Sequence, residues 1–255
     1  MKTVITHFYN EEYLLPRWLE HHKKIFDFGV LIDYGSTDNS RAICHEICPH
    51  WQVFQSAYGY FDAIDCDKEV MFYERQIQGW RIALNTTEFL MTKDIDAMTP
   101  LWGARMQWFI PCIRFTKWDP TGSLDPNKPL WEQITTGVNY NSNPVACSRS
   151  LHNFNDIDYK MADGSGSAAG RHFTKHNTED MLIFHYAHCI VGEPMIKRRL
   201  QIQNMVSPRD RREQLGTHHY IDNQGLNLDR LNHMHSNYIA VGESDCSEYI
   251  KRVTI

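Results

Sequence analysis

The sequence lacks the features that mark several classes of protein. Its apolar runs fall short of the roughly 20 residues that a membrane-spanning helix needs. Its seven cysteines include no Cys-x-x-Cys pair, which argues against a disulfide framework and a Cys-rich zinc site. The first residues are too few and too polar for a signal peptide. A formal net charge of −5 with scattered basic residues is atypical of nucleic-acid binding. We therefore expect a soluble, cytoplasmic protein with reduced thiols, no membrane span and no nucleic-acid partner.

The first hundred residues alternate between strand-like and helix-like patterns. Short β-branched and aromatic runs predict strands at 4–9, 29–33, 51–54 and 88–92. Helical spacing predicts helices at 10–26, 41–47 and 67–85 between them, with Cys44 and Cys48 in the buried stripe of the second. This alternation is typical of an α/β fold with a mostly parallel sheet and helices on both faces.

The pattern is less regular after residue 100. We expect strands at 108–115, 171–176 and 181–186, with loops at 119–128 and 163–170. With no internal repeat and no clear linker, residues 1–255 are predicted to form one domain with an irregular C-terminal extension.

Polar side chains follow three of the predicted strands. Asn10, Asp33 and Asp94 each stand where a strand ends, and ligands of open α/β sheets bind beyond the carboxyl ends of the strands. Asp94 and Asp96 are one residue apart, and carboxylates are the ligands that Mg²⁺ and Mn²⁺ prefer. The sequence thus predicts a single cleft that holds a divalent cation against a diphosphate.

Three ordered segments carry a family resemblance: residues 6–22 with Asn10-Glu11, residues 32–40 with Asp33-Tyr34-Gly-Ser-Thr-Asp38, and residues 92–98 with Asp94-Ile-Asp96. Together they resemble the opening half of GT-A glycosyltransferases, most closely family 2-like and family 92-like enzymes. The resemblance implies a Rossmann-like GT-A sheet and transfer of a sugar from a UDP- or GDP-sugar donor to a glycan or glycoconjugate acceptor. It also implies Mn²⁺ or Mg²⁺ as cofactor, a nucleotide-binding half at 1–100 and an acceptor half at 101–255.

The resemblance also implies site residues. Those expected to bind the nucleotide are Thr6, Asn10, Glu11, Asp33, Tyr34, Ser36, Arg75 and Asp94, and those expected to bind the metal are Asp94, Asp96 and His185. The chain departs from the family in two places. Tyr34 stands where many members have a second Asp, and Ala97-Met98 stands where Glu-Phe often follows the acid pair.

The resemblance further implies that the sugar is transferred with inversion by direct displacement, which needs a base that takes the proton of the acceptor hydroxyl. Comparison with the family favours Asp156, followed by Asp158, and leaves Asp119 and Glu132 as alternatives. The pair Glu179-Asp180 resembles a hairpin turn instead.

Two other functions compete with glycosyl transfer. One is a catalytically silent protein of the same fold that binds a sugar nucleotide or a glycan. The other is a sugar-nucleotide nucleotidyltransferase, but residues 6–12 lack the Gly-rich, Arg- or Lys-bearing phosphate loop that we expect after its first strand.

Overall fold

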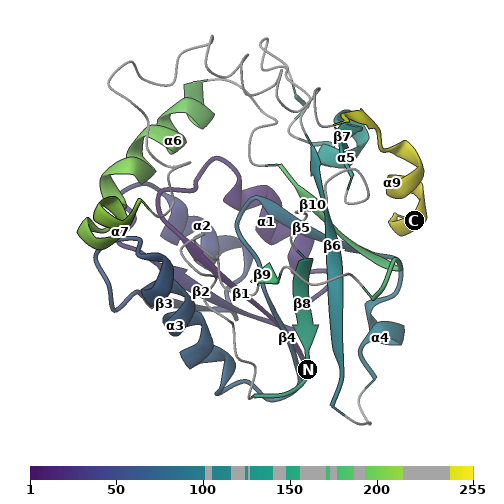
Figure 1. Ribbon diagram of the computed structural model, residues 1–255, viewed down its shortest axis with the longest axis horizontal. Helices are drawn as coiled ribbons and strands as arrows, with labels where there is room; N and C mark the ends of the chain where they lie inside the picture. Colours follow the sequence, from purple (N-terminus) through teal and green to yellow (C-terminus); the bar gives the residue numbers. More distant parts are fainter. Residues whose placement is uncertain are drawn as a thin grey trace.

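The computed structural model describes residues 1–100, 105–115, 124–125, 127–139, 148–155, 171–172, 177–186, 193–214 and 242–254 (Figure 1). In this part of the chain the strands join in one hydrogen-bonded sheet with the order β11-β7-β6-β8-β4-β1-β2-β3. Strand β10 pairs with β5 and β6, and β9 pairs with β8. The fold is an α/β arrangement of the Rossmann-like kind, as predicted.

Four neighbouring strands form a parallel block. They are β3 (Gln52–Gln55), β2 (Phe28–Asp33), β1 (Lys2–Phe8) and β4 (Trp80–Ala83), and each pair within the block is parallel. The edge of the sheet where these strands end is called the carboxyl edge below, and the edge where they begin is called the amino edge. The predicted strands at 4–9, 29–33 and 51–54 are confirmed as β1, β2 and β3.

The rest of the sheet is mostly antiparallel. It contains β5 (Glu88–Thr92), β6 (Gln107–Phe115), β7 (Thr136–Val138), β8 (Ser148–His152), β9 (Arg171–His172), β10 (Met181–His185) and β11 (Ser244–Asp245). Of these, β6 and β10 are parallel, whereas β8 is antiparallel to both β4 and β6. The predicted hairpin at 177–180 is wrong for the described residues, since β9 pairs with β8 and β10 pairs with β5 and β6.

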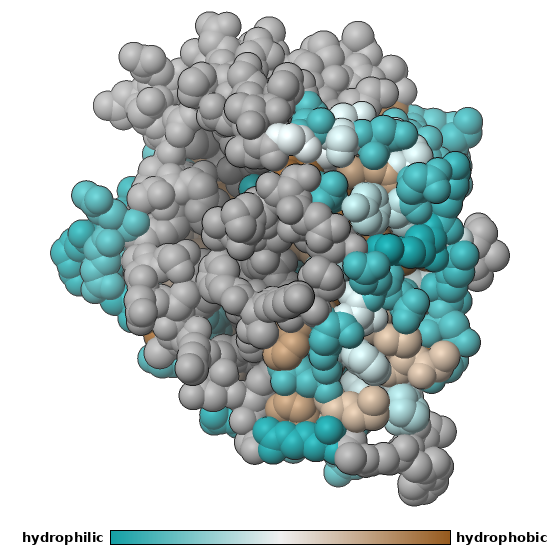
Figure 2. Space-filling model, turned by 45° about the vertical axis from the view of Figure 1, so that its right-hand side comes forward, coloured by the Kyte–Doolittle hydropathy of each residue, from teal (hydrophilic) through white to brown (hydrophobic). Residues whose placement is uncertain are grey.

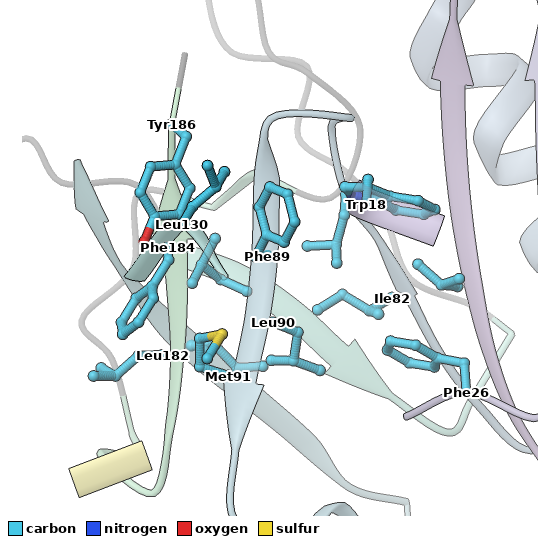
Figure 3. Close-up of a cluster of buried hydrophobic side chains, with 14 of the residues drawn as sticks. Trp18, Phe26, Ile82, Phe89, Leu90, Met91, Leu130, Leu182, Phe184 and Tyr186 are labelled. Atoms are coloured by element: carbon cyan, nitrogen blue, oxygen red, sulfur yellow. The ribbon is translucent and has the colours of Figure 1, made fainter. Parts of the chain in front are cut away.

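Helices cover both faces of the parallel block. Helices α1 (Leu15–His22) and α2 (Ser40–Ile47) pack on one face, where Trp18 and Leu31 belong to the larger hydrophobic core. Helix α3 (Ala63–Glu74) packs on the other face with Val70, Val30 and Ile32. Alternate residues of β2 thus serve opposite cores, as the period of two requires. Figure 3 shows the larger core between α1, β5 and β10.

The predicted helix at 67–85 is wrong in its second half. Helix α3 ends at Glu74, and Gly79 adopts a φ of +96° before β4 begins at Trp80. A β-carbon at this glycine would collide with the backbone of Met1, so only glycine fits the turn. In β4, Ile82 faces the α1 core and Ala83 faces the α3 core, which is strand periodicity.

Strand β5 runs against the parallel block. Because β8 is antiparallel to β4 and to β6, β6 runs in the direction of β4, and β10 follows β6. Strand β5 is antiparallel to β10, so it runs from the carboxyl edge toward the amino edge. Four residues, 84–87, lie between β4 and β5, and the last three of them, called the Asn85–Thr87 turn below, therefore reverse the chain at the carboxyl edge.

Two histidines of α1 bind the backbone of β5. His22 Nε2 accepts from the N–H of Leu90 at 3.2 Å, so its Nδ1 carries the proton and donates to the carbonyl of Trp18 at 2.9 Å. His21 Nε2 lies 2.7 Å from the carbonyl of Leu90. Burial lowers the pKa of His21 to about 4 and that of His22 well below its usual value. Neutral imidazoles thus satisfy both backbone groups of Leu90.

The remaining described helices lie around the sheet. They are α4 (Ile95–Met98), α5 (Leu130–Gln133), α6 (Glu193–Met205), α7 (Pro208–Glu213) and α9 (Ser247–Val253). In Figure 1, α6 and α7 lie toward the upper left and α4 lies at the lower right. The described surface in Figure 2 is mostly polar, with small, separated apolar patches. Among the described helices, none is long and apolar enough to cross a membrane.

Cys44 and Cys48 occupy the buried stripe of α2 and its C-terminal cap, as predicted, and both are free thiols. Burial raises the pKa of Cys44 to about 12 and that of Cys48 to about 11. These thiols are therefore protonated and apolar in character at neutral pH.

Candidate functional site at the carboxyl edge

Two loops interlock where β1 and β2 end. The backbone N–H of Asn10 donates to Ser36 Oγ at 2.9 Å, and Asn10 Oδ1 accepts from the N–H groups of Thr37 and Asp38 at 2.7 and 3.2 Å. The backbone N–H of Glu11 donates to Ser40 Oγ at 2.7 Å. The structure thus brings together Asn10, Glu11, Asp33 and Ser36, four of the residues predicted to bind a nucleotide.

The Asp33 carboxylate is the buried anion of this network. Its Oδ1 accepts from the N–H of Ser36 at 2.8 Å, and its Oδ2 accepts from Arg41 Nη1 at 3.2 Å. Asp33 is only 1% exposed, whereas the Arg41 side chain is 44% exposed. The buried Asp33 carboxylate therefore holds the guanidinium group of Arg41, which solvent or a ligand can also reach.

Asn10 and Glu11 are bound from the far end of the chain by α6. Gln201 exchanges two hydrogen bonds with Asn10, and Arg198 Nε lies 2.6 Å from both carboxylate oxygens of Glu11. All four side chains are at least partly buried. The carboxyl edge is therefore built from both halves of the chain, not from residues 1–100 alone.

Tyr34 is buried instead of lying open beside Asp33. Its ring stacks on Phe61 with centroids 4.6 Å apart, and its hydroxyl donates to Glu69 Oε2 at 2.9 Å. Burial raises the pKa of this phenol, which stays protonated. Thr6 is likewise buried, and its hydroxyl lies 3.5 Å from the carbonyl of His7. The structure gives both residues packing contacts within the protein.

The prediction that Asp94 shares a cleft with Asn10 and Asp33 is wrong. Asp94 follows β5, which runs toward the amino edge, and its Oδ1 caps α4 by accepting from the N–H of Ala97 at 2.9 Å. Asp96 forms an ion pair with Lys2, the first residue of β1. The acid pair therefore lies at the opposite edge of the sheet, at the start of α4, which is seen at the lower right of Figure 1.

Arg75 is also away from the predicted nucleotide site. It caps the C-terminus of α3, five residues before β4 begins, and its carbonyl accepts from Asn155 Nδ2 at 3.2 Å. Asn155 follows β8, which ends at the amino edge, and it also contacts Arg81 at the start of β4. Arg75 therefore belongs with the amino edge, like the acid pair.

A buried ion pair lies where β4 gives way to β5. Arg149 Nη2 is 2.6 Å from Glu88 Oε2, which also accepts from the N–H of Asn85 at 2.9 Å. Burial and the charge of Arg149 lower the pKa of His7 to about 4, although the charge of Glu88 acts to raise it. His185 closes β10 in register with Glu88. Of the residues predicted to bind a metal, His185 is thus the one that the structure places at the carboxyl edge.

A family motif at the turn between β4 and β5 was missed in the sequence analysis. The Glu-Phe pair expected after the acid pair is present as Glu88-Phe89, directly after the Asn85–Thr87 turn. Directly before this pair, where the resemblance implies the acid pair, the chain carries Asn85, Thr86 and Thr87. This turn has no acidic side chain of its own.

The predicted Mn²⁺ or Mg²⁺ site does not fit these residues. Asp94 and Asp96 follow the end of β5 that lies beside Met181, whereas His185 lies beside its first residue, Glu88. Among the residues that the structure describes, no group of three or more His, Cys, Asp or Glu side chains is arranged to hold a metal ion. We therefore assign no step to a metal.

The candidates for the general base are spread over different parts of the chain. Asp156, Asp158 and Asp119 lie outside the described residues. Glu132 lies in the short helix α5, and Glu179 forms an ion pair with Arg252 at 2.9 Å. The base stays a prediction.

Comparisons with known proteins give limited matches. No family model and no curated protein matches the chain. Among solved structures, S. aureus TarS 1-349 aligns with a TM-score of 0.39 and 14% identity over 80% of this chain and 64% of that one. The complex of TarS 1-349 with UDP-GlcNAc aligns with a TM-score of 0.31 and 17% identity over 38% of this chain and 28% of that one. This chain thus covers less than two thirds of either TarS chain, and similarities of this size do not identify a function.

Proposed function

We propose that this protein is a glycosyltransferase that binds a nucleoside diphosphate sugar at the carboxyl edge, beside β1, and transfers the sugar to an acceptor hydroxyl. The observation that carries the proposal is the interlocked pair of loops after β1 and β2, with the buried Asp33 carboxylate between Ser36 and Arg41. The ordered resemblance of these same loops to glycosyltransferases supports it.

The topology supports the same location. Strand β1 lies between β2 and β4, and the chain proceeds from β1 to β2 and β3 on one side before it crosses to β4 on the other. Such a reversal of strand order leaves a crevice at the carboxyl ends of the two strands, where ligands of open α/β sheets bind. In this chain Asn10 follows one of these strands and Asn85 follows the other.

Three guanidinium groups lie at this edge, where a diphosphate would be bound. Arg41, Arg149 and Arg198 each pair with a buried acid at this edge, namely Asp33, Glu88 and Glu11. Guanidinium groups recognise phosphate oxygens in a fixed, bidentate geometry. Arg41 is the most exposed of the three and is the one we assign to contact the ligand.

Isothermal titration with UDP, GDP and their sugars, with and without Mn²⁺, tests the proposal. Asp33→Asn keeps the size of the side chain and removes its charge. Hydrogen bonds to charged groups contribute about 1.5 to 3 kcal/mol, so we expect nucleotide binding to weaken by about tenfold or more. Asp94→Asn, the same substitution at the amino edge, is the control and is expected to bind as the wild type does. If neither nucleotide binds the wild type, with or without Mn²⁺, the proposal is wrong.

A catalytically silent protein that binds sugar nucleotides is the second candidate. It is favoured by the Asn85–Thr87 turn, which carries no carboxylate where the family places its acid pair. Turnover separates the two functions. Release of UDP or GDP from the corresponding sugar nucleotide in the presence of glycan acceptors supports the transferase, and nucleotide binding without release supports the silent protein.

A further inference from the structure

Helix α6 holds the loop after β1 through two side chains one helical turn apart. Gln201 Nε2 donates to the carbonyl of Asn10 at 3.0 Å, and Asn10 Nδ2 donates to Gln201 Oε1 at 2.9 Å. Arg198 Nε lies 2.6 Å from each carboxylate oxygen of Glu11. Residues three apart share one face of a helix, so a single face of α6 binds two consecutive residues of the loop.

These contacts fix which way the Asn10 amide points. Its Nδ2 donates to Gln201 and also to Thr37 Oγ1 at 3.2 Å, which turns Oδ1 toward the backbone N–H groups of Thr37 and Asp38. An amide has a donor end and an acceptor end, so fixing one end fixes the other. Gln201 of α6 and the loop that follows Asp33 therefore select the same orientation of this amide.

The backbone of Asn10 adds a reason for such support. Asn10 adopts a φ of +51°, in the left-handed region that is unfavourable for most L-residues. Asparagine tolerates this region better than most residues, and the backbone carbonyl bound by Gln201 belongs to the same residue. The contact therefore restrains a backbone conformation that is otherwise readily lost.

The other end of α6 is anchored independently. The N–H of Phe61 donates to the carbonyl of Met205 at 2.6 Å, and the N–H of Ser207 donates to the carbonyl of Phe61 at 2.7 Å. Ser207 Oγ also donates to Asp62 Oδ2 at 2.8 Å. Removing the contacts at Asn10 would therefore leave α6 attached to the segment before α3.

We propose that Gln201 and Arg198 are positioning residues of the nucleotide site, which act through Asn10 and Glu11 to hold the loops after β1 and β2 in the binding conformation. This inference rests on the proposed function. It assigns to the C-terminal half of the chain a part in binding the donor nucleotide.

The test compares two substitutions in α6. Gln201→Met keeps the length of the side chain and removes both hydrogen bonds to Asn10, and Leu200→Gln is the control because Leu200 is 42% exposed on the same helix. We expect Gln201→Met to weaken binding of UDP or GDP by about 5- to 30-fold, the loss of one or two hydrogen bonds. In turnover with the sugar nucleotide, KM should rise while kcat stays near the wild-type value. The control should match the wild type.

Hydrogen exchange provides a readout that does not depend on the nucleotide. In Gln201→Met the amides of Thr37 and Asp38 should exchange about tenfold faster, while amides in the core strands β1 and β2 stay protected. If Gln201→Met does not fold, Arg198→Lys provides the second variant. It keeps the charge, loses the guanidinium contact with Glu11, and should weaken nucleotide binding less than Arg198→Ala does.

Unchanged nucleotide affinity together with unchanged exchange at Thr37 and Asp38 in Gln201→Met would overturn the inference. Failure of the proposed function looks different. In that case the wild type binds neither UDP nor GDP, and the exchange rates of Thr37 and Asp38 still decide whether α6 positions the loops.

Discussion

Neutralising the acid pair Asp94 and Asp96 distinguishes the two edges of the sheet. The double variant Asp94→Asn/Asp96→Asn removes both charges and keeps the cap of α4, because Asn caps helices as well as Asp does. Asp96 lies against Lys2, and β1 extends from there through Phe8 to the carboxyl edge. Seven strand residues at about 3.3 Å each place the acid pair roughly 20 Å from Asn10.

The distance sets the size of the expected effect. Two unit charges about 20 Å apart in water interact by about 0.2 kcal/mol, and physiological salt, with a Debye length of about 8 Å, reduces this further. We therefore expect the Kd for UDP or GDP to change by less than about 1.5-fold, with or without Mn²⁺. Stability should fall by less than about 1 kcal/mol, because the Asp96 side chain is 80% exposed and Lys2 keeps Asp27 at 3.8 Å.

Isothermal titration gives the affinities, and urea unfolding gives the stability. A tenfold loss of Mn²⁺-dependent nucleotide affinity in the double variant would refute the placement of the acid pair at the amino edge. It would restore the site expected from sequence. The same titrations on Asp33→Asn provide the positive comparison at the carboxyl edge.

Two further predictions concern stability. Gly29→Ala puts a β-carbon into the ring of Trp51, so the free energy of unfolding should fall by about 3 kcal/mol or more, whereas Gly59→Ala, in open space, should change little in urea unfolding. On acidification, His21 has a pKa of about 4 when folded and about 6.5 when unfolded, so unfolding takes up protons and stability falls as the pH drops. Between pH 7 and pH 5 the loss is about 2 kcal/mol from His21 alone, with a further loss from His22, and a urea midpoint that stays constant over this range would contradict it.

The first 55 residues were predictable because their signals are local. The short apolar run Val30-Leu31-Ile32 in β2 and the small polar residues after Asp33 specify a strand followed by a turn without reference to the rest of the chain. Asn10-Glu11 and Asp33 were therefore assigned to the correct edge. Their partners were not, since Gln201 is 191 residues from Asn10 and no periodicity links two such distant segments.

The acid pair was misplaced by a single error with a global consequence. Ile77, Trp80 and Leu84 have helical spacing in the sequence, so the four-residue strand β4 was assigned to the end of the preceding helix. Successive elements of the chain run in opposite directions across the sheet, so leaving out one strand reverses the direction predicted for the next one. With β4 omitted, β5 becomes the next parallel strand, and Asp94 moves from the amino edge to the carboxyl edge.

One local signal was strong enough to correct this error. Gly79 precedes Trp80-Arg81-Ile82-Ala83, and glycine near the end of a predicted helix marks its termination. Had the helix been ended there, the Asn85–Thr87 turn would have stood at the carboxyl edge and Glu88-Phe89 directly after it. The direction assigned to a strand depends on every strand before it, so omitting one short strand such as β4 moves the residues after the next strand to the opposite edge of the sheet.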